Sequence, residues 1–374
     1  MIFGPGLDWL SHTLTRTEHA TSEKIVVLDD GTGLQLQDSG LLYLEPPTGR
    51  PNPNNESLIV SAGIHGNETA PIEVLNHLLN ELIDGQWQLA CPALLILGNP
   101  MAMDAGQRFI DVNLNRLFGG AHRKPEYRNF PEAERARLLE DACKAFATRH
   151  SDNVCHYDLH TAIRPSLREK FALYPFVEGR DIPDGQIDFL LEAEVETLLL
   201  QHREGTTFAS FSSSELGAES FTVELGKVRP FGQNDLSRFT GIANALRRRL
   251  KGEEPPKRDK GAAPITVFEV VHEILNTGDS FQFHVPDDVA NFTMPEIMAQ
   301  AIGGHSVELE NANGNKPATV VAVVSRMGRV RCSTALRTAS RMSSPFSNCR
   351  SITSSSTIAL FTTIPTRAIT PSSD

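Results

Sequence analysis

The chain has 374 residues, of which 40% are hydrophobic and 22% are charged, and its formal net charge is −11. This composition is typical of a folded globular protein with a substantial core, and it excludes fibrous and wholly disordered chains. The negative charge argues against nucleic acid as a partner, because phosphates require a basic face. No apolar run is long enough to span a bilayer and residues 1–13 lack a basic secretory leader, so we expect no membrane partner and a cytoplasmic location.

The first half of the chain alternates between strand and helix patterns. Residues 23–45 alternate polar and apolar side chains between glycines, which predicts a region of antiparallel hairpins. A strand over residues 58–63, a helix over residues 70–83 and a strand over residues 93–97 follow. Strand, helix and strand in this order predict a right-handed crossover in an α/β sheet, where ligands gather at the carboxyl ends of strands.

The second half continues this pattern and then becomes β-rich. Its periodicity predicts helices over residues 131–150, 187–201 and 234–250 and strands over residues 153–159 and 220–225. We therefore expect three parts, namely an α/β catalytic domain, a linker and a smaller β-rich domain, over residues 1–250, 251–262 and 263–322.

Residues 323–374 differ from the rest of the chain, because they are rich in Ser, Thr and Arg and contain no Lys and a single acidic residue. Such a segment predicts a disordered extension, since it cannot bury enough apolar area to offset its ordering entropy. A reading frame that shifts after about residue 291 would give the same change, and an uninterrupted frame on resequencing would reject that hypothesis. Both interpretations stay open.

Two short motifs contain side chains that ligate metals. His65 and Glu68 stand three residues apart across a glycine-bearing turn, and His160 follows another apolar strand. Two histidines and a carboxylate at strand ends suit a catalytic zinc site, which leaves a fourth position for water. Cobalt and manganese suit the same donors. The five cysteines are widely spaced, so they predict neither disulfides nor a thiolate metal site, and we expect them to be buried.

Two residues beside His160 bear on this site. Asp158 precedes it by two positions and suits the role of orienting the histidine ring. His156 shares the same face of the strand and is the alternative ligand, although packing or a hydrogen bond explains it more simply.

A buried acid and a basic loop add chemistry to the metal motif. Glu224 lies inside an apolar strand, where burial would raise its pKa toward the range of a general base that activates water. Arginine pairs bidentately with carboxylates, so we expect Asn115 and Arg116 to bind a substrate carboxylate. Arg108 would face the developing oxyanion, and the alternative is a solvated basic loop.

Four motifs in chain order resemble the succinylglutamate desuccinylase and aspartoacylase family, relatives of the zinc carboxypeptidases. They are H-G-N-E at 65–68, R-x-x-D-x-N-L-N-R at 108–116, D-L-H-T at 158–161 and V-E-L-G at 223–226. The resemblance covers roughly residues 50–235. It implies a carboxypeptidase-like α/β domain with a mixed central sheet flanked by helices, and a smaller C-terminal β-rich domain.

The resemblance also implies a site and a reaction. One zinc would be bound by His65, Glu68 and His160, with Glu224 as the catalytic acid and base. The reaction would be hydrolysis of the amide bond of N-succinyl-L-glutamate to succinate and L-glutamate, the last step of arginine catabolism by the succinyltransferase pathway. This small anionic substrate carries three carboxylates, and Arg164 is a further candidate to bind one of them.

Alternatives remain at the level of substrate and class. Another N-acyl amino acid, such as an acylated aspartate, or a peptide C-terminus would suit the same zinc site. A non-catalytic module with a structural metal is a different class, and the buried Glu224 argues against it. The chain has no tyrosine after Tyr174, whereas aspartoacylases place a C-terminal tyrosine in the active site, and its last fifty residues do not resemble the family's C-terminal domain. A homo-oligomer is left open by the composition.

Overall fold

The computed structural model describes residues 9–15, 24–150, 153–162, 168–256, 265–276 and 356–363. The described elements fall into two compact units. The first unit contains all the helices and the strands β1 to β9, and the second contains β10 and β11. The domain boundaries at residues 250 and 263 stay predictions.

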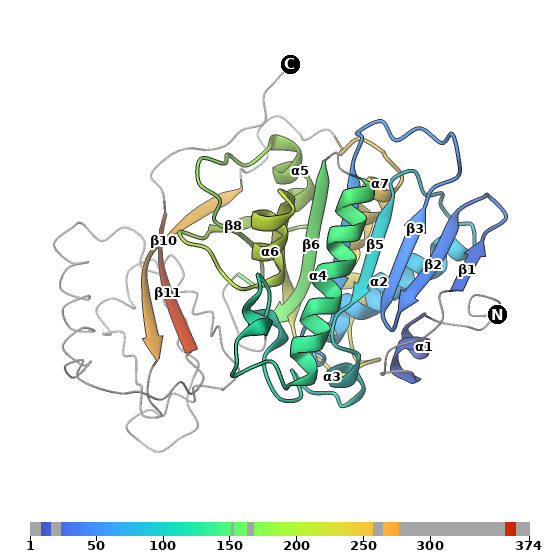
Figure 1. Ribbon diagram of the computed structural model, residues 1–374. Coiled ribbons are helices and arrows are strands. Elements are labelled where there is room, and N and C mark those ends of the chain that lie inside the picture. The colour runs from blue at the N-terminus through green and yellow to red at the C-terminus, as the bar shows by residue number, and fades with distance from the viewer. Residues whose placement is uncertain are drawn as a thin grey trace, which may run out of the picture. The chain divides into compact units, whose positions relative to one another are not determined.

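A mixed sheet forms the centre of the first unit, with strand order β1-β2-β3-β5-β4-β6-β9-β7-β8 (Figure 1). Its four central strands β5, β4, β6 and β9 are parallel, whereas β3 and β7 pair antiparallel with this group. The strands are Lys24–Val27, Gly33–Asp38, Leu41–Glu45, Ser57–Ala62, Ala93–Leu97, Val154–Ala162, Lys170–Tyr174, Thr197–Leu200 and Glu219–Lys227, for β1 to β9 in turn. The predicted α/β class with a mixed sheet is confirmed.

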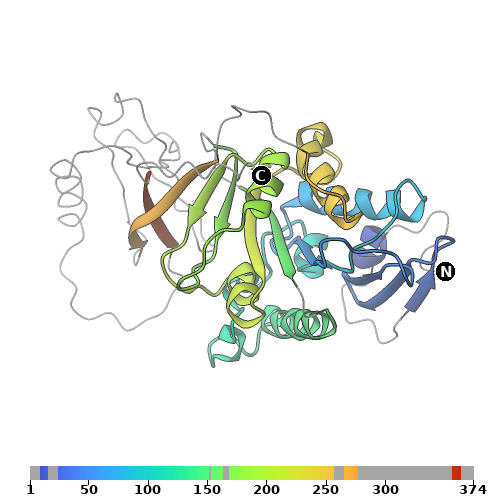
Figure 2. The same ribbon diagram turned by 90° about the horizontal axis from the view of Figure 1, so that it is seen from above.

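Helices cover both faces of this sheet. Figure 2 shows α4 and α6 on one face and α2, α5 and α7 on the other. The helices are Trp9–Thr15, Thr69–Ile83, Pro100–Asp104, Pro131–Arg149, Asp184–Glu192, Phe208–Glu215 and Thr240–Leu250, for α1 to α7 in turn. Three short 3-10 turns, η1 to η3, are Leu114–Arg116, Ala121–Arg123 and Leu236–Phe239. None of the helices in the described ranges is long and apolar enough to cross a membrane.

The crossover that leads into the site follows the predicted pattern. Helix α2 connects β4 to β5, which run parallel. Its apolar side chains recur at helical spacing and are buried, and Pro71 occupies its first turn, where a missing N–H is harmless. This crossover places the residues after β4 at the carboxyl end of the sheet.

One predicted helix is wrong. Residues 187–201 form the end of α5 and then strand β8, not a single helix. The helix ends at Glu192, and Glu194 has a φ of 62°, which a helix cannot continue through. The apolar residues that follow pair parallel with β7, from Leu198 opposite Ala172.

Other differences concern the bounds of two predicted elements and two elements that were not predicted. The predicted helix over residues 234–250 is a 3-10 turn followed by α7, and β6 extends to Ala162. Strand β7 and helix α6 were missed. Helix α6 contains four serines, which compete with the helix for backbone hydrogen bonds and weaken the helical signal, although the Thr207 side chain caps it by accepting from Ser210 N–H.

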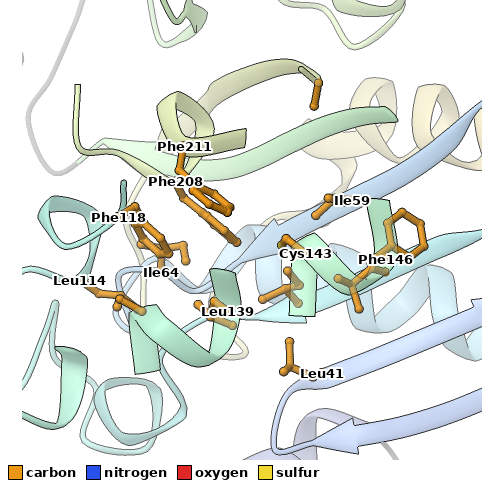
Figure 3. Close-up of a cluster of buried hydrophobic side chains, with 14 of the residues drawn as sticks. Leu41, Ile59, Ile64, Leu114, Phe118, Leu139, Cys143, Phe146, Phe208 and Phe211 are labelled. Atoms are coloured by element: carbon orange, nitrogen blue, oxygen red, sulfur yellow. The ribbon is translucent and has the colours of Figure 1, made fainter. Parts of the chain in front are cut away.

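The core on the α4 and α6 face is built from aromatic and aliphatic side chains (Figure 3). Phe118 stacks on Phe208 with ring centroids 4.3 Å apart, and Phe211 lies next to both. Cys143 is part of this cluster. It is buried and free, as are the other two cysteines in the described ranges, Cys91 and Cys155, which confirms that expectation for these three.

The second unit contains an antiparallel pair of strands. Strand β10, Thr266–Asn276, pairs with β11, Ser356–Thr363. β10 lies in the predicted β-rich domain. β11 lies in the segment predicted as an atypical tail, and the other residues of that segment are outside those described.

Candidate metal centre and active site

Three predicted ligands come together at the carboxyl end of the central strands. The side-chain donor atoms of His65, Glu68 and His160 lie within 4.8 Å of one another, and all three residues are buried. The two Nδ1 atoms flank the Glu68 carboxylate. His65 Nδ1 lies 2.9 Å from Oε1, and His160 Nδ1 lies 2.9 Å from Oε2.

The turn between β4 and α2 brings the side-chain donor atoms of His65 and Glu68 close together. The Gly66 N–H donates to the Arg108 carbonyl, and the Glu68 N–H donates to the His65 carbonyl. A Cβ at Gly66 would lie 2.2 Å from the carbonyl carbon of Ala102. Glycine is therefore required because the turn touches the backbone of α3. Glu68 occupies the N-cap position of α2 but does not cap it with its side chain, so its carboxylate stays directed at the histidines.

The opposite edge of each histidine ring is held by an oxygen acceptor. His65 Nε2 lies 3.1 Å from Asn113 Oδ1, and His160 Nε2 lies 2.8 Å from Asp158 Oδ2. Asn113 Oδ1 also accepts the Asn115 N–H, so it is oriented as an acceptor. These acceptors hold a proton of each ring on Nε2, so that each Nδ1 can offer its lone pair to a bound ion.

The donor set fits a zinc ion. His65 Nδ1 is buried and, among the described residues, lacks a hydrogen-bond partner, because its short contact with Glu68 does not have hydrogen-bond geometry. Two atoms that approach without bonding to each other can direct their lone pairs at a shared third atom. Two imidazole nitrogens and a carboxylate are ordinary ligands of a catalytic zinc. His156, the alternative ligand, is not part of the group.

The charges at this centre have opposite effects on its ionisable groups. Burial, and then Arg108, lower the pKa of His65 to about 4. Burial would also lower the pKa of His160, but the carboxylates of Asp158 and Glu68 raise it well above its usual value. Burial would raise the pKa of Glu68, but the two histidines and Arg108 lower it well below its usual value. Glu68 is thus held as a carboxylate.

Glu224 lies beside the ligand group. It sits on β9 directly opposite His160 on β6, so the two side chains emerge on the same face of neighbouring parallel strands. Its side chain is buried, and among the described residues its Oε2 has no hydrogen-bond partner. Burial, followed by the charge of Glu68, raises the pKa of Glu224 to about 7. A carboxyl group with such a pKa can both accept and donate a proton near neutral pH.

The basic loop supplies cations next to these acids. Arg108 Nη1 donates to Glu68 Oε1 at 2.6 Å, so Arg108 lies within the site. Arg116 takes part in none of the ion pairs of the described residues, and its Nη1 donates to the Asn115 carbonyl at 2.5 Å. Burial and the neighbouring Arg108 lower the pKa of Arg116 to about 9. Arg116 is half-buried, and a partly desolvated guanidinium without a carboxylate is costly, so a bound anion would relieve that cost.

The remaining predicted residues have different outcomes. Asn115 is buried, and its Oδ1 accepts the Phe208 N–H at 2.8 Å, which leaves its amide nitrogen as the donor for a ligand. Asp158 holds His160 as described above. Arg164 lies outside the described residues.

Sequence reasoning missed the contact of Asn113 with His65. Asn113 belongs to the quoted R-x-x-D-x-N-L-N-R motif, which was the available signal. Nothing in the linear order shows that its oxygen reaches a histidine 48 residues earlier.

Comparisons with known proteins agree with this geometry. The family model for the succinylglutamate desuccinylase/aspartoacylase catalytic domain matches residues 54–250. A succinylglutamate desuccinylase of Pseudomonas paraeruginosa is 41% identical over 294 residues, covering 78% of this chain and 87% of the relative. One of Ectopseudomonas mendocina is 43% identical over 304 residues, covering 80% and 89%.

Solved structures extend the likeness to the fold. The crystal structure of the succinylglutamate desuccinylase from Chromobacterium violaceum is 35% identical, with a TM-score of 0.67. The alignment covers 84% of this chain and 95% of that one. The enzyme of the same name from Vibrio parahaemolyticus is 30% identical, with a TM-score of 0.66, covering 79% and 84%.

Proposed function

Because this chain belongs to the succinylglutamate desuccinylase/aspartoacylase family, we propose that it is a zinc-dependent hydrolase that cleaves N-succinyl-L-glutamate to succinate and L-glutamate. The reaction would be the last step of arginine catabolism by the succinyltransferase pathway. The observation that carries the proposal is the buried His65, Glu68 and His160 group with Glu224 beside it. The relatives named for this activity support the choice of substrate.

The proposed mechanism uses Glu224 as the proton carrier. A zinc ion held by the three ligands would supply a Lewis acid and make water acidic enough to ionise near neutral pH. Glu224 accepts a proton from the attacking water, whose oxygen bonds to the amide carbon. The C–N bond then breaks, and Glu224 returns the proton to the leaving amine nitrogen of glutamate.

The loop residues would bind the anionic substrate. Arg116 and the amide nitrogen of Asn115 would bind one substrate carboxylate, since a guanidinium fork matches that group. Arg108 uses one of its five N–H donors on Glu68 and keeps others for the oxyanion that forms during attack. The partner is therefore a small N-acyl amino acid with several negative charges.

The test combines metal content with turnover in the purified full-length chain. We expect one zinc per chain and succinate release from N-succinyl-L-glutamate that is lost on chelation and restored by zinc. N-acetyl-L-aspartate and a blocked dipeptide serve as comparison substrates under equal conditions. Faster turnover of either comparison substrate would refute the proposed specificity, and full activity without metal would refute the metal site.

A further inference from the structure

A continuous line of buried polar side chains connects helix α6 to the ligand group. Ser212 Oγ lies 2.8 Å from His156 Nδ1, and His156 Nε2 lies 2.8 Å from Ser61 Oγ. Ser61 donates to Asp158 Oδ1 at 2.6 Å, and Asp158 Oδ2 lies 2.8 Å from His160 Nε2. Each of the five residues is 2% exposed or less, so solvent does not screen these contacts.

The chemistry of the groups permits only one direction of hydrogen bonding along this line. Asp158 Oδ1 accepts the Ser61 hydroxyl and Asp158 Oδ2 faces the N–H of His160 Nε2, so both oxygens of Asp158 act as acceptors. Ser61 therefore gives Asp158 its single proton and must accept from His156 Nε2. Burial lowers the pKa of His156 to about 4, so its ring is neutral, and its Nδ1 accepts from Ser212.

The surroundings of His156 are apolar, which makes this polar line unusual for its place. Its ring meets the Phe208 ring edge-on at 4.6 Å between centroids, next to the aromatic cluster of Figure 3. Ile59 lies opposite it on β4. An apolar side chain could fill the position of His156. The buried polar side chains are tolerated there only because each of them is hydrogen-bonded to the next.

We propose that Ser61, His156 and Ser212 are positioning residues that act through Asp158 on His160. Together they fix Asp158 as an acceptor, and this keeps a His160 proton on Nε2 and its Nδ1 directed at the metal. The inference rests on the proposed metal site, because His160 is one of its ligands. By this inference, His160 is positioned by a row of hydrogen-bonded side chains that reaches α6, and not by Asp158 alone.

Two pairs of variants test the proposal through zinc affinity of the metal-free protein, measured by competition with a chromophoric chelator. Ser61→Ala removes the donor to Asp158, and we expect zinc to bind about tenfold or more weakly, as for other outer partners of metal ligands. Ser220→Ala is its control. Ser220 is buried, lies opposite His156 on β9 and bonds only to the Ala218 carbonyl among the described residues, so its loss should leave zinc affinity unchanged.

The second pair of variants tests whether His156 acts through its hydrogen bond to Ser61 or only by filling space in the core. His156→Gln keeps a donor where Nε2 lies and can still reach Ser61, so its zinc affinity should stay close to that of the unaltered protein. His156→Asn places its amide where Nδ1 lies and cannot reach Ser61, so zinc should bind more weakly. Urea unfolding of each metal-free variant reports any loss of stability separately.

The outcomes distinguish this inference from the proposed function. If the unaltered chain binds no zinc, the metal site and the inference both fall. If the unaltered chain, Ser61→Ala and His156→Asn bind zinc equally well, only the inference is overturned. If Ser220→Ala and Ser61→Ala weaken zinc binding equally, the loss of any buried hydroxyl has the same effect. That result would also overturn the inference.

Discussion

At the residue scale, the two buried carboxylates of the site have pKa values that move in opposite directions. Glu68 is surrounded by His65, His160 and Arg108, and these neighbours lower its pKa despite burial. Glu224 has an unpartnered oxygen among the described residues, and burial raises its pKa to about 7. Environments that separate two carboxylates in this way suit one to a permanent charge and the other to proton transfer.

Glu224→Gln should remove the proton carrier and leave the ligands in place. We expect kcat for N-succinyl-L-glutamate to fall by about 10²–10⁴-fold, the usual contribution of general acid–base catalysis, with zinc content unchanged. Glu219→Gln is the matched control, because Glu219 starts the same strand and accepts from the Tyr174 hydroxyl instead. Unchanged turnover in the Glu224 variant would contradict the assigned role.

Arg116→Lys should weaken substrate binding while keeping the positive charge. An ammonium cannot make the bidentate contact, and loss of one charged hydrogen bond costs about 1.5–3 kcal/mol, so kcat/KM should fall roughly tenfold or more. Arg123→Lys, an exposed position further along the same loop, should leave kcat/KM unchanged. Steady-state kinetics with both variants test this prediction. Equal kcat/KM values for the two variants would contradict a role of Arg116 in binding substrate.

Residue types and their order were enough to nominate the ligands, because histidine and carboxylate at strand ends have a specific chemistry. The contacts that hold those ligands were only partly visible. Asp158 was found because it stands two positions from His160, whereas Asn113 reaches His65 across 48 residues. Spacing along a strand reports near neighbours only, so the distant partner required the folded chain.

At the scale of elements, the contact between the β4–α2 turn and α3 determines where His65 and Glu68 lie. Gly66→Ala would force a Cβ into the Ala102 backbone, which cannot rotate away as a side chain can. We expect a loss of about 3 kcal/mol or more in the free energy of unfolding, at the upper end for overpacking. Urea unfolding with Gly185→Ala as control tests this, since a Cβ at Gly185 meets nothing within 4 Å.

Sequence periodicity found most helices and strands but could not separate α5 from β8. Residues 187–201 contain apolar side chains at spacings that suit a helix, yet Leu198 to Leu200 pair with β7, a strand that was itself missed. Pairing between strands depends on a partner elsewhere in the chain. A local pattern therefore cannot show it when the partner has no clear signal of its own.

At the scale of the whole molecule, the ligand group joins segments almost a hundred residues apart, so metal binding should stabilise the folded chain. A zinc concentration of about 100 times Kd would raise the free energy of unfolding by about 2.7 kcal/mol. Thermal unfolding with zinc and with chelator measures this difference. His65→Ala should abolish the zinc effect, whereas variant His77→Ala, at an exposed position on α2, should retain it.

The sequence alone determined the α/β class, the order of most elements and the side chains able to ligate a metal. These features depend on local periodicity and on residue chemistry, which are written in the linear order. Only the tertiary structure decided that Glu224 stands opposite His160, that Arg116 is half-buried without a carboxylate partner among the described residues, and that Ser61, His156 and Ser212 connect α6 to Asp158. Each of these facts depends on strand register or burial between distant segments, which exists only once the sheet has formed.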